Sequence, residues 1–78
     1  MSATVCDVTV HIDEVLNERE LVNLEQAIRS DEGVVSVGHN EKDKHFMVVL
    51  YDPEEIRGKD ILGRVTDQGF HGELIGFL

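Results

Sequence analysis

Apolar residues recur along the chain at two different spacings, and each spacing predicts a different kind of element. From residue 4 to residue 12, apolar and polar side chains alternate, as in a β-strand that is buried on one face. After residue 20 the apolar positions lie three and four residues apart, which is typical of a helix. Alternation returns in three later segments, and a second helical spacing falls between the last two. The pattern predicts strands over 4–12, 34–39, 45–52 and 70–77 and helices over 18–31 and 59–68.

The residues before the first predicted helix carry the signature of a helix start. Asn17 is a preferred N-cap residue, and Glu20, three positions later, can reach back to its amide in a capping box. Leu16 and Leu21 flank this pair and can pack against each other as a hydrophobic staple. Both features place the beginning of the helix at residue 18.

The order strand–helix–strand–strand–helix–strand predicts an α+β fold of the ferredoxin-like type. In that fold a four-stranded antiparallel sheet, with its strands in the order 4-1-3-2, carries two helices on one face. The polar segment 40–44 is short enough to join the two middle strands as a hairpin. With 78 residues, 41% of them hydrophobic, the chain 1–78 is expected to form one domain around one core.

Three short motifs follow one another at the spacing found in a known family: Gly33-Val34 followed by Val37, Tyr51-Asp52-Pro53, and Gly69-Phe70. On these motifs and the predicted order of elements, the chain resembles the heavy-metal-associated (HMA) domain family, which includes copper chaperones and the N-terminal domains of metal-transporting P-type ATPases. The resemblance covers nearly the whole chain. It implies the same ferredoxin-like fold that the pattern predicts.

The family's metal-binding motif, by contrast, has no counterpart in this chain. In HMA domains a Met-x-Cys-x-x-Cys motif at the end of the first strand holds a soft ion such as Cu(I), and the matching positions here are Val15, Asn17 and Glu20. An amide and a hard carboxylate do not replace thiolates toward Cu(I), because soft sulfur ligands match soft metals. The resemblance therefore implies a fold whose soft-metal site is lost, with a capping box in its place.

Four histidines are the remaining candidates for metal chemistry. In the predicted sheet, the end of the first strand, the hairpin and the start of the last strand meet at one end of the domain, and the histidines lie in or beside these segments. Together with Asp13, Glu41 or Asp43 they could bind Zn(II), Ni(II) or Cu(II) weakly, whereas the simpler alternative is scattered surface histidines. No resident cofactor is expected. The candidate metal ligands are His11, His39, His45 and His71.

The segment 45–52 is apolar on both faces of its predicted strand. If Met47, Val49 and Tyr51 pack against the helices, alternation places the other apolar side chains on the side of the sheet that no helix covers. Such a patch is typical of a surface that binds a protein partner or a second copy of the chain, although central strands of small sheets are also often apolar throughout. The candidate interface consists of Phe46, Val48, Leu50, Ile75 and Phe77.

Charge and cysteine content narrow the expected partners and the compartment. Seven basic residues against sixteen acidic ones give a formal net charge of -9, which disfavours nucleic acid as a partner because its recognition depends on Lys and Arg. No apolar run is long enough to cross a membrane, so no membrane insertion is expected. The lone Cys6 shares the alternation of the first strand and is expected to be a small core side chain. A single thiol and the lack of a secretory signal favour a cytoplasmic protein.

The sequence contains no motif that predicts catalysis. It has no Ser/His/Asp or Cys/His arrangement in a suitable register and no glycine-rich phosphate loop, so no enzyme activity is expected. Two functions stay open. The first is a small non-enzymatic HMA-like domain that has lost its soft-metal site and acts as a protein-interaction or regulatory module. The second is a divergent heavy-metal-binding or transport-associated protein with histidine and carboxylate ligands. A ligand-sensing domain of the ferredoxin-like regulatory type is a third hypothesis.

Overall fold

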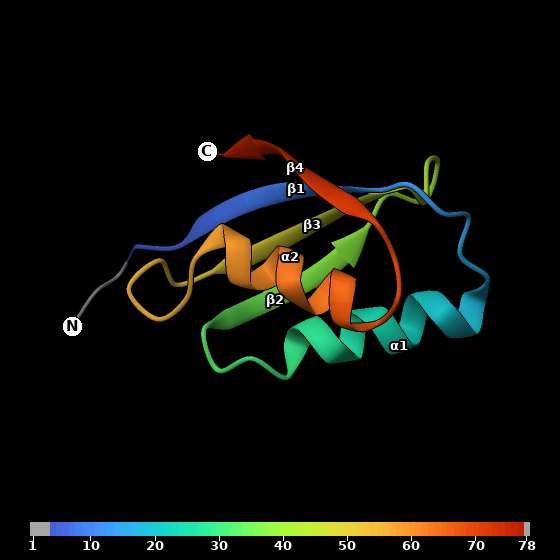
Figure 1. The fold of residues 1–78 in the computed structure, drawn as a ribbon. Helices are drawn as coiled ribbons and strands as arrows, with labels where there is room; N and C mark the ends of the chain where they lie inside the picture. The colour runs from blue at the N-terminus through green and yellow to red at the C-terminus, as the bar shows by residue number, and fades with distance from the viewer. Residues whose placement is uncertain (1–3, 78) are drawn as a thin grey trace.

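The computed structural model describes the backbone of residues 4–77 and the side chains of residues 4–75. Its elements follow in the predicted order (Figure 1). They are β1 (Cys6–Ile12), α1 (Glu18–Arg29), β2 (Val34–His39), β3 (Phe46–Tyr51), α2 (Gly58–Asp67) and β4 (Gly72–Phe77). The ferredoxin-like class predicted from the sequence is confirmed.

The four strands form one antiparallel sheet in the order β2-β3-β1-β4, which is the predicted order read from the opposite edge. Both helices lie on the same side of this sheet (Figure 1). One face of the sheet is therefore covered, and we call the other the open face. Neither α1 nor α2, the helices found within residues 4–77, is long and apolar enough to cross a membrane.

Alternation along the strands sends every second side chain into the layer between the sheet and the helices. Val8 and Val10 of β1 are buried there, as are Met47, Val49 and Tyr51 of β3. This is the face predicted for the three β3 residues. Each fully buried aliphatic side chain stabilises the folded state by roughly 1.5–3 kcal/mol. The helices complete the core with Leu21, Leu24, Ile28, Ile61 and Val65.

Cys6 lies at the start of β1 and packs against this core. Its Cα partner on β3 is Tyr51, and burial raises the pKa of the Tyr51 phenol. Cys6 was expected to be a small core side chain, and the structure places it half-buried at the edge of the core.

The last strand begins two residues later than the pattern predicts, because α2 ends in a Schellman motif. Gly69 adopts a positive φ of 89°, a conformation that favours glycine. The Gly69 N–H donates to the Thr66 carbonyl at 2.9 Å, and the Phe70 N–H donates to the Val65 carbonyl at 3.2 Å. Phe70 therefore still closes the helix, and the sheet ladder starts at Gly72.

Gly33 stands where the turn after α1 passes closest to the loop that follows β3. A Cβ atom at this position would lie 2.8 Å from Cβ of Glu55 and 2.8 Å from Cγ2 of Ile56, which is closer than side chains approach one another. The Gly33 carbonyl also accepts a hydrogen bond of 2.8 Å from the Asp52 N–H. The first two motifs of the family resemblance thus touch each other, and glycine is the residue that fits between them.

Candidate functional site

The segment between β1 and α1 ends in a complete capping box. The Glu20 N–H donates to Oδ1 of Asn17 at 2.8 Å, and the Asn17 N–H donates to Oε1 of Glu20 at 3.0 Å. Leu16, just before the cap, is 7% exposed, and Leu21, just inside the helix, is 1% exposed; both belong to the core. The predicted start of the helix is confirmed, and its polar and apolar contacts hold the end of the loop together.

Glu14 ties the same loop to the start of β4. Its carboxylate accepts one hydrogen bond from the His71 N–H at 2.8 Å and another from Nδ1 of the His71 ring at 2.6 Å. Beside it, the Asp13 N–H donates to the His71 carbonyl at 2.8 Å. We call the Glu14–His71 contact the loop latch.

The loop latch changes the acid–base properties of both its members. Hydrogen bonds from the His71 backbone and ring lower the pKa of Glu14. The hydrogen bond to Glu14, and then the charge of that carboxylate, raise the pKa of His71. The latch therefore favours the charged form of each side chain.

The β2–β3 hairpin contacts the residues on either side of this loop. The Ile12 N–H donates to the His45 carbonyl at 2.7 Å, and Nδ1 of His45 lies 2.6 Å from the Ile12 carbonyl oxygen. A carbonyl oxygen can only accept, so Nδ1 of His45 carries the proton. Nζ of Lys44 donates to Oε1 of Glu18 at 2.9 Å, and this hydrogen bond lowers the pKa of Glu18 and raises that of Lys44. The residues on either side of the loop, Ile12 and Glu18, are thus both hydrogen-bonded to the hairpin.

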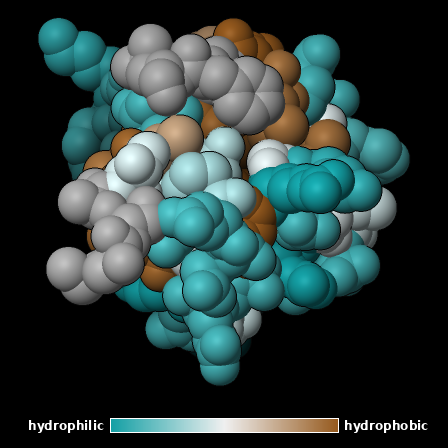
Figure 2. Space-filling view, turned by 90° about the vertical axis from the view of Figure 1, so that its left-hand side faces the viewer, coloured by the Kyte–Doolittle hydropathy of each residue, from teal (hydrophilic) through white to brown (hydrophobic). Residues whose placement is uncertain are grey.

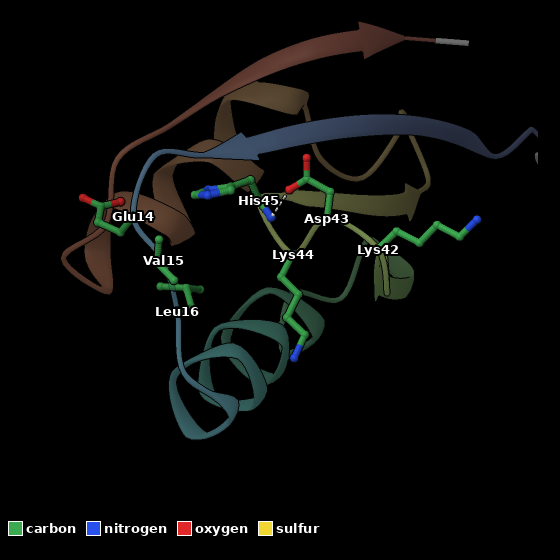
Figure 3. A pocket seen from close by; sticks show the side chains of 7 residues that line it. All are labelled: Glu14, Val15, Leu16, Lys42, Asp43, Lys44 and His45. Carbon is green, nitrogen blue, oxygen red and sulfur yellow. Dashed lines mark hydrogen bonds between the residues drawn. The ribbon is translucent and has the colours of Figure 1, made fainter.

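A pocket of about 200 Å³ lies between this loop and the hairpin. Figure 3 shows the side chains that line it, with Lys44 extending toward α1 and a hydrogen bond of 3.0 Å from the His45 N–H to Oδ1 of Asp43. Val15 is 85% exposed, which is unusual for an apolar side chain of its size. The sequence reasoning missed this pocket; the apolar Val15 within a polar loop was the only signal of it. The lining residues are Glu14, Val15, Leu16, Lys42, Asp43, Lys44 and His45.

The four histidines proposed as metal ligands do not meet at one point. The His11 and His45 rings stack with their centroids 5.6 Å apart, whereas His71 belongs to the loop latch. The ring of His39 lies on the helix side of the sheet, where Nδ1 is 2.9 Å from Oε2 of Glu25 on α1. Within residues 4–75, no group of three or more His, Cys, Asp or Glu side chains is arranged to hold a metal ion.

Of these histidines, only His11 and His45 come together, and their geometry does not suit a shared ion. Nδ1 of His11 lies 3.3 Å from Oδ1 of Asp13. The two ring planes are 16° from parallel. An imidazole nitrogen binds a metal in the plane of its ring, so two stacked rings cannot share an ion until one of them turns.

The open face carries the apolar side chains expected of it on β3. Val48 and Leu50 are each 36% exposed, and Ile75 of β4 is 51% exposed. Phe46 is half-buried, with its ring edge against His11 at a centroid distance of 5.2 Å. In Figure 2 hydrophobic groups gather along the upper edge of a face that is otherwise largely hydrophilic.

Phe77, the fifth residue of the candidate interface, is the last residue of β4. The ladder between β1 and β4 shifts between Thr9 and Val10, and the Cα partner of Phe77 is Val8. The Phe77 side chain lies outside the described residues.

Solved structures show which fold this is. No family model matches the chain, and no curated protein matches it. A copper-binding domain from HMA7, a P-type ATPase, superposes with a TM-score of 0.84 at 19% identity, covering 92% of this chain and 96% of its own. The N-terminal domain of a potential copper-translocating P-type ATPase from Bacillus subtilis, in the Cu(I)-loaded state, gives 0.86 at 20% identity, with 96% and 92% covered. The apo copper chaperone of Enterococcus hirae gives 0.78 at 20% identity, with 87% and 98% covered.

The fold is that of HMA domains. This chain has a single cysteine, so the Cys-x-x-Cys motif is absent. Cys6 cannot serve in its place, because six residue steps along β1, at about 3.3 Å each, separate it by roughly 20 Å from the loop that follows Ile12. The HMA fold is therefore present without the pair of thiolates.

Removing the cap is expected to weaken the start of α1. Asn17→Ala leaves the Glu20 N–H without its acceptor and should lower the free energy of unfolding by about 1 kcal/mol in urea denaturation. Asn23→Ala, an exposed site on the same helix away from the cap, is the control and should be neutral or slightly stabilising. Equal effects of the two variants would contradict a capping role for Asn17.

The loop latch predicts a pH window for stability. A lowered Glu14 pKa contributes stability above the ordinary value of 4.5 and loses it as the pH falls through the shifted value. A raised His71 pKa contributes stability below 6.5 and loses it as the pH rises through the shifted value. The latch is therefore fully formed between pH 4.5 and 6.5, and the destabilisation by Glu14→Gln should be greatest there.

The His71 pKa itself is read from its ring proton shifts during an NMR pH titration. It should fall toward 6.5 in Glu14→Gln and stay unchanged in Glu32→Gln, an exposed carboxylate at the other end of α1. A His71 pKa that is the same in all three proteins would show that no latch exists in solution.

Proposed function

We propose that this chain is a non-enzymatic HMA-like domain that has lost its soft-metal site and works as a protein-interaction or regulatory module without a metal. The observation that carries the proposal is the capping box of Asn17 and Glu20. By the spacing of the motifs in the sequence, these two residues correspond to the thiolate ligands of the family. In their place stands a pair of hydrogen bonds that stabilises the loop by itself.

The rest of the loop supports the same proposal. The loop latch and the contacts with the hairpin bind the loop from two sides through protein groups alone. A metal-binding loop of soft thiolates needs access and deprotonated ligands. Here the carboxylate of Glu14 and Nδ1 of His45 are already engaged, and the sequence supplies no second thiol.

A metal-binding function through histidine is the second candidate. The observation that favours it is the proximity of His11, His45 and Asp13 at the loop end of the sheet. Zn(II), Ni(II) and Cu(II) accept imidazole and carboxylate ligands. This candidate requires the stacked rings to separate, because in the stacked arrangement they offer no common point to an ion.

A metal titration followed by two-dimensional amide NMR distinguishes the two candidates. Cu(I), Zn(II) and Ni(II), added separately to the chain, are expected to cause no saturable shift at one equivalent. Saturable shifts centred on His11 and His45, abolished by His11→Asn, would instead establish the metal-binding candidate.

A gain-of-function variant tests whether positions 17 and 20 correspond to the cysteine ligands of the family. Asn17→Cys combined with Glu20→Cys restores the spacing Cys-x-x-Cys, and the double variant should bind one equivalent of Cu(I), since two thiolates suit this ion. Asn23→Cys combined with Gln26→Cys, the same spacing within α1, is the control. A double variant at positions 17 and 20 that binds no better than the control would contradict the correspondence of these positions with the lost ligands.

A further inference from the structure

We propose that the open face of the sheet is the docking surface for one amphipathic α-helix of another protein, with an apolar stripe flanked by lysines or arginines. The inference rests on the proposed function, whose partner it specifies. It is argued from three features of the open face: its row of apolar side chains, its charge, and its area.

The apolar row runs along β3, where Phe46, Val48 and Leu50 follow at every second residue. Such side chains lie about 6.6 Å apart, close to the spacing of successive turns on one face of a helix. On the β2 side, the Cα partners of Leu50 and Val48 are Ser36 and Gly38. A Cβ atom at Gly38 would meet nothing within 4 Å. Small residues therefore border the row on the β2 side, where a partner's helix can approach the backbone closely.

The charged side chains that the strands carry on the open face are carboxylates. All seven lysines and arginines of the chain lie outside the four strands. On the β1 side, Asp7 is the Cα partner of Leu50, and His11, the partner of Phe46, has Glu73 of β4 as its other partner. Asp7 thus borders the apolar row directly, Glu73 lies one strand further out, and no lysine or arginine lies in the strands of this face. A partner with basic flanks complements it, as opposite charges across an interface favour association.

The same charge disfavours a second copy of the chain as the occupant. Two copies would each bring a formal charge of -9 and would set Asp7 and Glu73 against the same carboxylates. Like charges placed together across an interface cost free energy. A helix with lysines or arginines beside its apolar stripe meets the acidic border instead.

The area of the open face also favours a single helix over a second copy of the chain as the occupant. Strands of about six residues span about 20 Å, and four strands at about 4.8 Å span about 19 Å, so the open face measures on the order of 400 Å². A stable interface between proteins buries about 800 Å² on each partner. The face alone thus falls short of a standard interface between two globular copies, whereas a helix about 10 Å wide, with about 14 residues at 1.5 Å each, fits within it and matches the length of the strands.

The test uses a synthetic peptide of about 14 residues with leucine at positions i, i+3, i+4 and i+7 and lysine elsewhere. It is added to the isotope-labelled full chain with a chelator present. Two control peptides are used: one with glutamate in place of lysine, and one with the leucine and lysine residues scrambled. The lysine peptide should cause saturable amide shifts confined to the strands of the open face, with those of β1, β2 and β3 next to the apolar row the largest. The glutamate and scrambled peptides should cause none there.

Variants of exposed residues assign the binding to the proposed surface. Val48→Ser combined with Leu50→Ser should weaken binding of the lysine peptide by about tenfold, since these side chains form the centre of the patch. Asp7→Asn combined with Glu73→Gln should weaken it by about threefold and flatten its salt dependence. Val22→Ser, at an exposed apolar side chain on α1, is the control and should change nothing.

Gly38→Gln provides a variant that removes no apolar group. A Cβ atom at Gly38 meets nothing within 4 Å, so the amide spectrum of the free variant should show an intact fold. The glutamine side chain projects from the open face beside the apolar row and should weaken peptide binding. Equal binding of the scrambled peptide, or shifts centred on the helices, would overturn the inference. A dimer in size-exclusion chromatography that Val48→Ser disperses would also overturn it, because the occupant would then be a second copy.

Failure of this inference and failure of the proposed function give different results. Loss of peptide binding with a silent metal titration removes the amphipathic helix as partner and leaves the metal-free module in place. A metal that binds at one equivalent removes the proposed function, whatever the peptide does.

Discussion

Asn17 and Glu20 exchange two hydrogen bonds at the point where the chain leaves the loop after β1 and enters α1. The first amides of a helix have no partners within the helix, and this exchange satisfies two of the groups that would otherwise depend on water. It also fixes where the helix begins, at Glu18. Leu21, Leu24 and Ile28 lie three and four residues apart and therefore share the face of α1 that packs against the sheet.

The same contacts explain how the HMA fold exists here without its thiolates. The loop is joined to β4 through Glu14 and His71, and Ile12, the last residue of β1, is joined to the hairpin through His45. Hydrogen bonds to a charged group such as the Glu14 carboxylate are among the stronger ones in proteins. The contacts of the loop are thus made by side chains and backbone of the chain itself.

Much of the fold could be predicted from the sequence, because its signals are local. A period of two fixed the four strands, a period of three to four fixed the helices, and Asn17 with Glu20 marked the start of α1. The buried face of β3 also followed, since Met47, Val49 and Tyr51 are its odd-numbered residues. The order of strands in the sheet then followed from the ferredoxin-like topology that this order of elements predicts.

The candidate site was less predictable, because it depends on contacts between segments that are distant in sequence. Alternation along the first strand places His11 on the open face, but it gave no sign that His39 faces α1, where it meets Glu25. The loop latch joins residues 57 positions apart, and no local pattern announces it. The register shift between Thr9 and Val10 changes the Cα partner of Phe77, and alternation within β4 alone could not show this.

The most direct test of the central claim is amide hydrogen exchange at Glu20 in protein treated with a chelator. The account predicts that the Glu20 amide exchanges more slowly than in Asn17→Ala, and that added Cu(I) leaves its rate unchanged, because the bond to Asn17 protects it without a metal. An amide that exchanges equally fast in both proteins, and becomes protected only when Cu(I) is added, would contradict the account.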